Sequence, residues 1–252
     1  MIIEHTDMSS ERPPYQLHPV TVTRCQQVAP HMKRITADGS CLTTLRPGLP
    51  AQWFKLFVRL GNGERSSGRA YTVRRFDPAT HELDIDFFLH GDNGPVSAWA
   101  ERARVGDRFE ISDVHPRSGV HIDPAAEHYL LFGDETALPA IGAILEALPA
   151  HAKAQVFSEV ANPAERQALT SAAALSVSWL FREDAQASSM PLEAAATALD
   201  LAGDAAVIWV AAESAQVAAI RRLMKARGID RTRLHAAGYW KRGEADHRDE
   251  NA

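Results

Sequence analysis

The chain has 252 residues, a net charge of −5, 45% hydrophobic and 23% charged residues, a composition typical of soluble globular proteins. The negative balance argues against binding nucleic acid or an acidic membrane through bulk charge, so an anionic ligand would need locally clustered bases. The two cysteines, Cys25 and Cys41, are too few for a disulfide framework or for an iron–sulfur cluster. Neither a signal peptide nor an apolar run near the roughly 20 residues of a membrane span is visible, and we expect a cytoplasmic protein.

The first half of the chain predicts a small antiparallel β-barrel over residues 19–124. Residues 1–18 are polar and proline-broken, and we expect them to form a flexible arm. Short runs rich in β-branched and aromatic residues then alternate with clusters of Gly, Pro, Asn and Asp, as strands and turns do. Strands are expected at 20–23, 32–37, 53–60, 71–74, 83–89 and 108–111, with one helix from 95 to about 104.

The second half predicts an α/β domain over residues 125–243. Apolar strands are expected at 129–132, 154–159, 175–180, 205–210 and 234–237, and helices at 136–148, 164–169, 192–199 and 214–227. Buried strands that alternate with helices are typical of a doubly wound parallel sheet. Residues 244–252 are expected to be a disordered tail.

The most unusual stretch is Arg69-Ala70-Tyr71-Thr72, inside a predicted strand. Alternate side chains of a strand share a face, so Arg69 and Tyr71 point one way and Thr72 the other. A cation, a ring and a hydroxyl together could hold the phosphates and the planar ring of a flavin. Taken alone, the tetrapeptide more often indicates an exposed edge strand with a tyrosine corner.

A second stretch, His90-Gly-Asp-Asn-Gly-Pro-Val-Ser97, leads into the predicted helix of the barrel domain. Its two glycines allow a close backbone approach, and Pro95 suits the first turn of a helix. The free N–H groups of that turn and Ser97 could bind an anion. A simple turn with a capped helix, and a structural role for His90, remain open.

Two further stretches follow predicted parallel strands, where ligands bind in open α/β sheets. One is residues 133–140 (Gly-Asp-Glu-Thr-Ala-Leu-Pro-Ala), in which Thr136 could cap the next helix. The other is residues 237–243, in which Tyr239 and Trp240 could cover a flavin ring and the following bases could attract an anion. An ordinary connection for the first, and packing of the chain end for the second, are the alternatives.

Together and in this order, these stretches resemble the siderophore-interacting protein family of FAD-dependent ferric-siderophore reductases. The resemblance covers 20–243 and rests on residues 69–72, 86–99, 133–140 and 238–243. It implies a ferredoxin-reductase-like fold with an FAD-binding barrel and a C-terminal NAD(P)H-binding domain. The FAD contacts predicted on this basis are Arg69, Ala70, Tyr71, Thr72, Asp86, Phe88, His90, Gly94, Pro95, Val96, Ser97, Asp134, Glu135, Thr136, Tyr239 and Trp240.

One turn departs from the family pattern. A Gly-Pro-Arg-Gly-like turn usually follows the strand that corresponds to Phe109, whereas residues 113–119 here read Asp-Val-His-Pro-Arg-Ser-Gly. The arginine is present as Arg117.

The resemblance implies hydride transfer from NAD(P)H to FAD, and then single electrons to iron(III) in a siderophore. Iron(II) binds hard oxygen ligands more weakly, so reduction releases the metal. The flavin supplies the redox chemistry, so no side chain is nominated as a catalytic acid or base, and none as a metal ligand. An anionic ferric siderophore would need a basic pocket, for which the candidates are Lys55, Arg117, Lys241 and Arg242.

The electron donor is less defined by the sequence. Glu159 ends a predicted strand, where a carboxylate accepts from a ribose 2′-OH and repels a 2′-phosphate, which favours NADH over NADPH. Arg166 argues for NADPH, and Glu213 is a second predicted contact of the nicotinamide nucleotide. A ferredoxin stays open as the donor. A general flavin or ferredoxin-type oxidoreductase and a non-catalytic siderophore-binding protein are the alternative functions.

Overall fold

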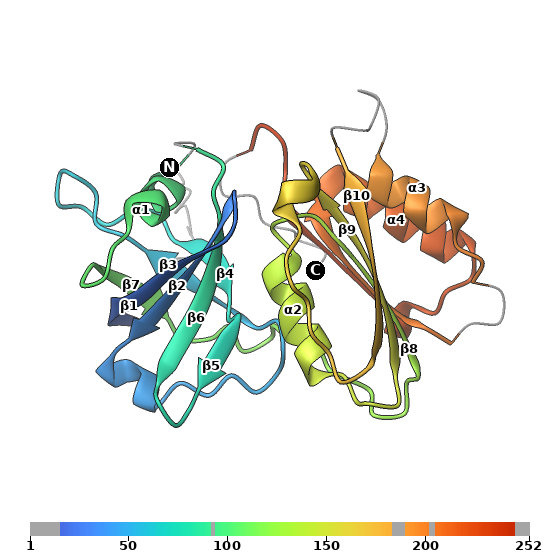
Figure 1. The fold of residues 1–252 in the computed structure, drawn as a ribbon, viewed down its shortest axis with the longest axis horizontal. Coiled ribbons are helices and arrows are strands. Elements are labelled where there is room, and N and C mark those ends of the chain that lie inside the picture. Colours follow the sequence, from blue (N-terminus) through green and yellow to red (C-terminus); the bar gives the residue numbers. More distant parts are fainter. Residues whose placement is uncertain (1–15, 92–93, 183–189, 202–204, 245–252) are drawn as a thin grey trace, which may run out of the picture.

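The computed structural model describes residues 16–91, 94–182, 190–201 and 205–244, and shows two sheets side by side (Figure 1). Within these ranges, no helix is both long and apolar enough to cross a membrane. The elements are β1 (Leu17–Ala29), β2 (Met32–Asp38), η1 (Ser40–Thr43), β3 (Trp53–Phe57), β4 (Arg69–Thr72), β5 (Arg75–Asp77), β6 (Glu82–Phe88), α1 (Pro95–Arg102), β7 (Arg108–Ser112), β8 (His128–Gly133), α2 (Leu138–Ala147), β9 (Lys153–Val160), η2 (Pro163–Glu165), β10 (Ala174–Phe181), α3 (Pro191–Ala198), β11 (Val207–Glu213), α4 (Ser214–Ala226), η3 (Arg231–Arg233) and β12 (Leu234–Trp240).

The N-terminal sheet has seven antiparallel strands in the order β4-β3-β7-β1-β2-β6-β5. Its core follows from strand alternation: Leu83, Ile85 and Phe87 of β6 are all fully buried in one hydrophobic cluster. The ring of Tyr71 on the edge strand β4 lies 4.6 Å from the ring of Phe87. The sheet therefore curls so that β4 approaches β6, as the predicted barrel requires.

The C-terminal sheet has five parallel strands in the order β10-β9-β8-β11-β12. Helix α2 packs on one face, while α3 and α4 pack on the other. The chain starts at β8, winds outward to β10 and then returns to β11 on the other side. The neighbouring strands β8 and β11 thus form the switch point at which open α/β sheets bind ligands.

The two sheets are joined through α2, which lies between them in Figure 1. Arg74, just after β4, donates to the Glu146 carboxylate on α2 at 2.6 Å. A Cβ on Gly142 would lie 3.0 Å from the Arg74 guanidinium, so any larger residue there would require the Arg74 side chain to shift. The two halves of the chain also meet at a second contact, where the His31 ring lies 2.5 Å from the buried carboxylate of Glu165.

Several predicted elements differ from those observed. The predicted helix at 164–169 is wrong: only the η2 turn forms, because so few residues make too few hydrogen bonds to offset helix nucleation. The short strand β5 was not predicted, and β3 ends at Phe57 instead of continuing to residue 60. Leu17 and His18, assigned to the N-terminal arm, pair with β7 in β1. Residues 1–15 of that arm and 245–252 of the tail lie outside the described residues.

Candidate functional site

The stretch Arg69–Thr72 forms the whole of strand β4. Its antiparallel register with β3 places Tyr71 opposite Phe54, and Thr72 opposite Trp53. Directly opposed residues share a face, so Tyr71 lies on the barrel-core side and Thr72 on the side of Trp53. Burial raises the pKa of Tyr71, and Arg69 only partly offsets this rise. The Arg69 guanidinium donates to the Ser67 hydroxyl at 2.9 Å.

The N-terminus of α1 lies in the second predicted stretch. Gly94 precedes the helix, Pro95 is its first residue, and no side chain described here caps it. The N–H groups of Val96 and Ser97 belong to this uncapped first turn, which favours an anion. The Ser97 hydroxyl donates to the carbonyl of Gly91 at 3.2 Å.

These two elements fit the parts of FAD. Tyr71 offers a ring, Thr72 a hydroxyl and Arg69 a cation, while the uncapped turn of α1 offers backbone donors for the pyrophosphate. His90 is exposed at the end of β6, with its ring 6.1 Å from that of Phe88. The residues present therefore match the chemistry that the cofactor needs.

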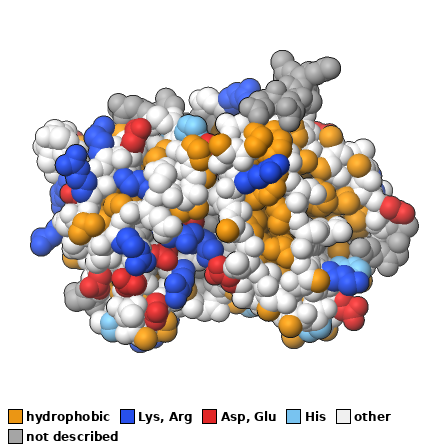
Figure 2. Space-filling model, in the orientation of Figure 1, with side chains coloured by type: hydrophobic (Ala, Val, Ile, Leu, Met, Phe, Trp, Pro, Cys, Tyr) orange, Lys and Arg blue, Asp and Glu red, His pale blue; other side chains and the backbone are white. Residues whose placement is uncertain are grey.

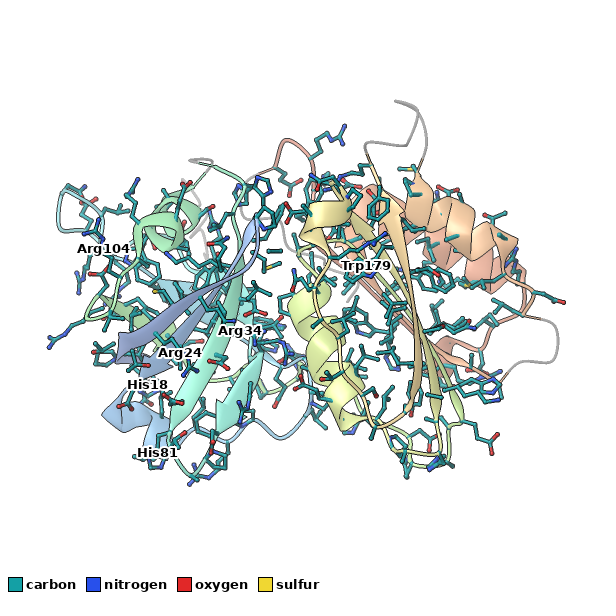
Figure 3. All side chains as sticks on the ribbon, in the orientation of Figure 1. His18, Arg24, Arg34, His81, Arg104 and Trp179 are labelled. Carbon is teal, nitrogen blue, oxygen red and sulfur yellow. The ribbon has the colours of Figure 1, made fainter. Side chains whose placement is uncertain are left out.

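Asp86 is held by other residues of the protein. Arg34, labelled in Figure 3, lies opposite it on β2 and donates to both carboxylate oxygens at 2.6 and 2.7 Å. Arg74 approaches the same carboxylate at 3.8 Å, and its side chain also reaches Glu146. In the structure, Asp86 thus belongs to a charge network that supports the segment following β4.

A third group of residues lies at the switch point of the parallel sheet. Asp134 follows β8, and its carboxylate accepts from the hydroxyl of Thr136 at 2.5 Å and from the Trp240 indole at 2.7 Å. Burial is the main cause that raises the pKa of Asp134 to about 6. Thr136 does not cap α2 as expected, because its hydroxyl donates to Asp134 and the helix begins after Ala137.

The acidic residues near this edge already have protein partners. Glu135 and Glu159 are buried, and both contact Arg182. Glu159 also accepts from the Gln216 amide at 2.8 Å. Glu213 caps α4, since its carboxylate accepts from the N–H of Ala215 at 2.6 Å.

The four predicted substrate bases fall into two groups. Lys55 is buried on β3 with its ammonium 5.7 Å from the centre of the Trp53 ring, and the exposed Arg117 lies in the loop after β7. Lys241 and the exposed Arg242 follow β12, and Lys241 pairs with Glu244 at 2.6 Å.

Two residues beside the predicted site, Trp53 and His115, were not predicted from the sequence. Their rings stack with centroids 4.2 Å apart and an interplanar angle of 18°. Burial, Arg117 and Lys55 together lower the pKa of His115 below its ordinary value. The only sequence signal was the unusual turn at 113–119, because a stack between residues so far apart leaves no local pattern.

The two halves of the molecule present different surfaces. Basic and acidic side chains are interspersed over the barrel, whereas apolar side chains gather over β10 (Figure 2). Trp179, labelled in Figure 3, belongs to this half-buried apolar face of β10 together with Leu175 and Val177. Charged groups that could meet an anionic ligand therefore lie mainly on the barrel side of this view.

Comparisons with known proteins identify the family. The model of the siderophore-interacting FAD-binding domain matches residues 58–118, which include β4 and α1, and that of the siderophore-interacting protein matches residues 126–243. The ferric vibriobactin reductase of Vibrio cholerae is 34% identical over 221 residues, which are 82% of this chain and 78% of the relative. The chain belongs to the siderophore-interacting protein family.

Solved structures agree with this assignment. A siderophore utilization protein from T. fusca superposes with a TM-score of 0.85 at 34% identity, covering 96% of this chain and 98% of the other. The siderophore-interacting protein of Aeromonas hydrophila gives 0.79 at 31% identity, covering 92% and 94%. A ferredoxin reductase of carbazole 1,9a-dioxygenase gives 0.73 at 16% identity, which concerns the fold alone. The predicted family and the ferredoxin-reductase-like fold are confirmed.

Proposed function

We propose that this protein is a flavin-dependent reductase that takes electrons from NAD(P)H and delivers them through FAD to ferric siderophores, releasing iron(II) in the cytoplasm. The observation that carries the proposal is the presence of strand β4 and of the first turn of α1, which no described side chain caps, inside the region matched by the FAD-binding domain. Relatives named ferric vibriobactin reductase and ferric acinetobactin reductase support the choice of substrate.

The protein's own residues bind and orient the cofactor. Tyr71 and Thr72 would hold the isoalloxazine ring, and Arg69 with the N–H groups of Val96 and Ser97 would hold the pyrophosphate. When bound, FAD supplies two-electron acceptance from a nicotinamide and one-electron delivery to iron(III). Asp134 holds the Trp240 indole by a 2.7 Å hydrogen bond, and this ring would cover the flavin.

Lys55 is the principal substrate base in this proposal. It lies opposite Ala70 on β4, beside Trp53, and is therefore next to the residues assigned to the flavin. Burial makes its charge act through a medium of lower dielectric than water, so it attracts an anion more strongly than an exposed base does. The anionic siderophore would also be attracted by three bases outside the barrel strands, namely Arg117, Lys241 and Arg242.

The donor assigned by this proposal is NADH. Glu159 lies at the carboxyl end of β9, where a carboxylate disfavours a 2′-phosphate, and Arg182 offsets part of its charge at 3.4 Å. Glu213 lies at the carboxyl end of β11, next to the switch point, and its carboxylate could also meet a ribose hydroxyl. A ferredoxin donor would predict turnover without any nicotinamide.

An anaerobic experiment tests the function. The flavoprotein is reduced with NADH, mixed with ferric siderophores of different charge, and followed by flavin absorbance together with an iron(II) chelator. We expect reoxidation that saturates with the concentration of an anionic ferric siderophore, and stoichiometric capture of iron(II). Reoxidation by none of the ferric complexes would refute the proposal. Reoxidation that does not saturate would favour a general flavin reductase.

A further inference from the structure

The His115 side chain is held in a fixed position beside β3. Its ring stacks on Trp53, and its backbone N–H donates to the carbonyl of Trp53 at 2.7 Å. The carbonyl of His115 in turn accepts from the N–H and the hydroxyl of Ser118 at 3.1 and 2.7 Å. The turn that departs from the family pattern thus places an imidazole on the indole.

This stack adjoins the strand assigned to the flavin. Trp53 lies opposite Thr72 in the β3–β4 register, and Lys55 lies opposite Ala70 on the same face. The Lys55 ammonium is 5.7 Å from the Trp53 ring centre, so the imidazole and the ammonium both border one indole. Arg117 follows two residues after His115.

The His115 side chain is half-buried, and part of it can be reached from outside. The Nδ1 atom is buried and has no hydrogen-bond partner in the described part of the chain. A ligand that reaches the ring from outside therefore meets it away from the buried Nδ1. The groups that act on this ring are the cations Lys55 and Arg117, together with burial, and all three lower its pKa. The lowered pKa favours the neutral ring when no ligand is bound.

We propose that His115 contacts the substrate and binds a proton when an anionic ferric siderophore docks against Lys55, Trp53 and Arg117. This inference rests on the proposed function and deepens it by naming a residue that selects for substrate charge. The ligand's negative charge offsets the two cations, so the imidazolium becomes favourable in the complex. Binding then takes up a proton, and affinity for an anionic siderophore falls as pH rises through the titration of His115.

A binding experiment without electron transfer tests the proposal. The probe is the gallium(III) complex of a tris-catecholate chelator, which is anionic and is not reduced by the flavin. Its Kd for the FAD-loaded protein is measured from tryptophan fluorescence across about pH 5.5–8. Calorimetry in buffers of different ionisation enthalpy then gives the proton uptake. Wild type should bind up to about tenfold more weakly per pH unit within the titration window, with net proton uptake.

Two variants separate titration from packing. His115→Phe keeps a ring on Trp53, and His115→Gln keeps a polar group, but neither can take up the proton. Both should lose the uptake, and the ratio of their Kd to that of wild type should approach a constant at high pH. Protonation of the chelate is common to all the proteins and cancels in this ratio. His151→Gln, an exposed histidine in the turn before β9, should behave as wild type.

The outcomes distinguish the inference from the function on which it rests. If the gallium complex binds but both His115 variants keep the wild-type pH dependence and proton uptake, His115 does not have this role and the proposed function is unaffected. If the complex does not bind wild type at any pH, the inference fails, whereas the proposed function is judged separately by the anaerobic reoxidation experiment with the other ferric siderophores.

Discussion

The indole Nε1 of Trp240 donates a 2.7 Å hydrogen bond to Oδ2 of Asp134, which lies 106 positions earlier in the sequence. This bond connects the end of β12 to the loop after β8. It crosses the switch point of the sheet and fixes the point from which Lys241 and Arg242 extend. A buried carboxyl thus determines the position of an aromatic ring and two bases.

The first prediction concerns Asp134 and pH. Burial raises its pKa from 3.8 to about 6, so between these values the folded state binds the proton more tightly than the unfolded state. The stabilisation that comes from protonating Asp134 is fully present below pH 3.8, and it is lost as pH rises through about 6. Wild type should therefore lose stability relative to Asp134→Asn as pH rises. The difference between their free energies of unfolding should change by about 1.4 kcal/mol per pH unit across this window. Urea unfolding at several pH values measures the difference.

Trp240→Phe provides the paired variant. It removes a hydrogen bond that lowers the pKa of Asp134, so the window should extend to higher pH than in wild type. Stability curves of wild type and Asp134→Asn that run parallel from about pH 4 to 8 would contradict the assignment.

The second prediction concerns the flavin phosphates. Arg69→Gln removes a cation with charge-assisted hydrogen bonds worth about 1.5–3 kcal/mol, so the Kd for FAD should rise about 10- to 100-fold. Equilibrium dialysis or flavin fluorescence of the apoprotein measures it. Arg65→Gln is the control, because Arg65 lies on the same connection but pairs with Glu110. If the Kd for FAD rose equally in the two variants, Arg69 would have no special role in binding the phosphates.

The third prediction concerns a close backbone approach. A Cβ on Gly238 would lie 2.3 Å from the hydroxyl of Ser214 and 3.2 Å from its Cα. Gly238→Ala should therefore destabilise the protein by about 1–3 kcal/mol in thermal or urea unfolding. Ser214→Ala removes the nearest atom, so the double variant should recover part of this loss. If the destabilisation of the double variant equalled the sum of the two single effects, the clash would not arise at Ser214.

The fourth prediction concerns the donor. The ratio of kcat/KM for NADH to that for NADPH should exceed one, and Glu159→Gln should reduce it about 3- to 10-fold by removing a negative charge. Arg166 is the comparison, since its guanidinium lies 4.9 Å over the Phe181 ring in the structure. If Arg166→Gln instead lowers kcat/KM for NADPH and Glu159→Gln changes nothing, the preference follows from Arg166.

The sequence predicted the elements whose pattern is local. The opposite faces of Tyr71 and Thr72 follow from strand alternation, and the β3–β4 register confirms them. The stacking of Trp53 on His115 could not be predicted, because it depends on how the loop after β7 folds back along β3. Likewise, the sequence suggested Thr136 as a helix cap, but Asp134 competes for the same hydroxyl.

The Asp86 network shows a further limit of sequence reasoning. The resemblance made Asp86 a flavin contact, and only the structure shows that Arg34 occupies both of its oxygens. Cross-strand pairing determined this, and it depends on a register between β2 and β6 that cannot be read from either strand alone.

Arg74 connects the barrel to the helix that packs on the parallel sheet. It lies two residues after Thr72 and is bound to α2 through Glu146. The ion pair therefore links the packing of α2 to the segment that follows β4. Any substitution that moves α2 is expected to change the position of the strand to which we assign the flavin.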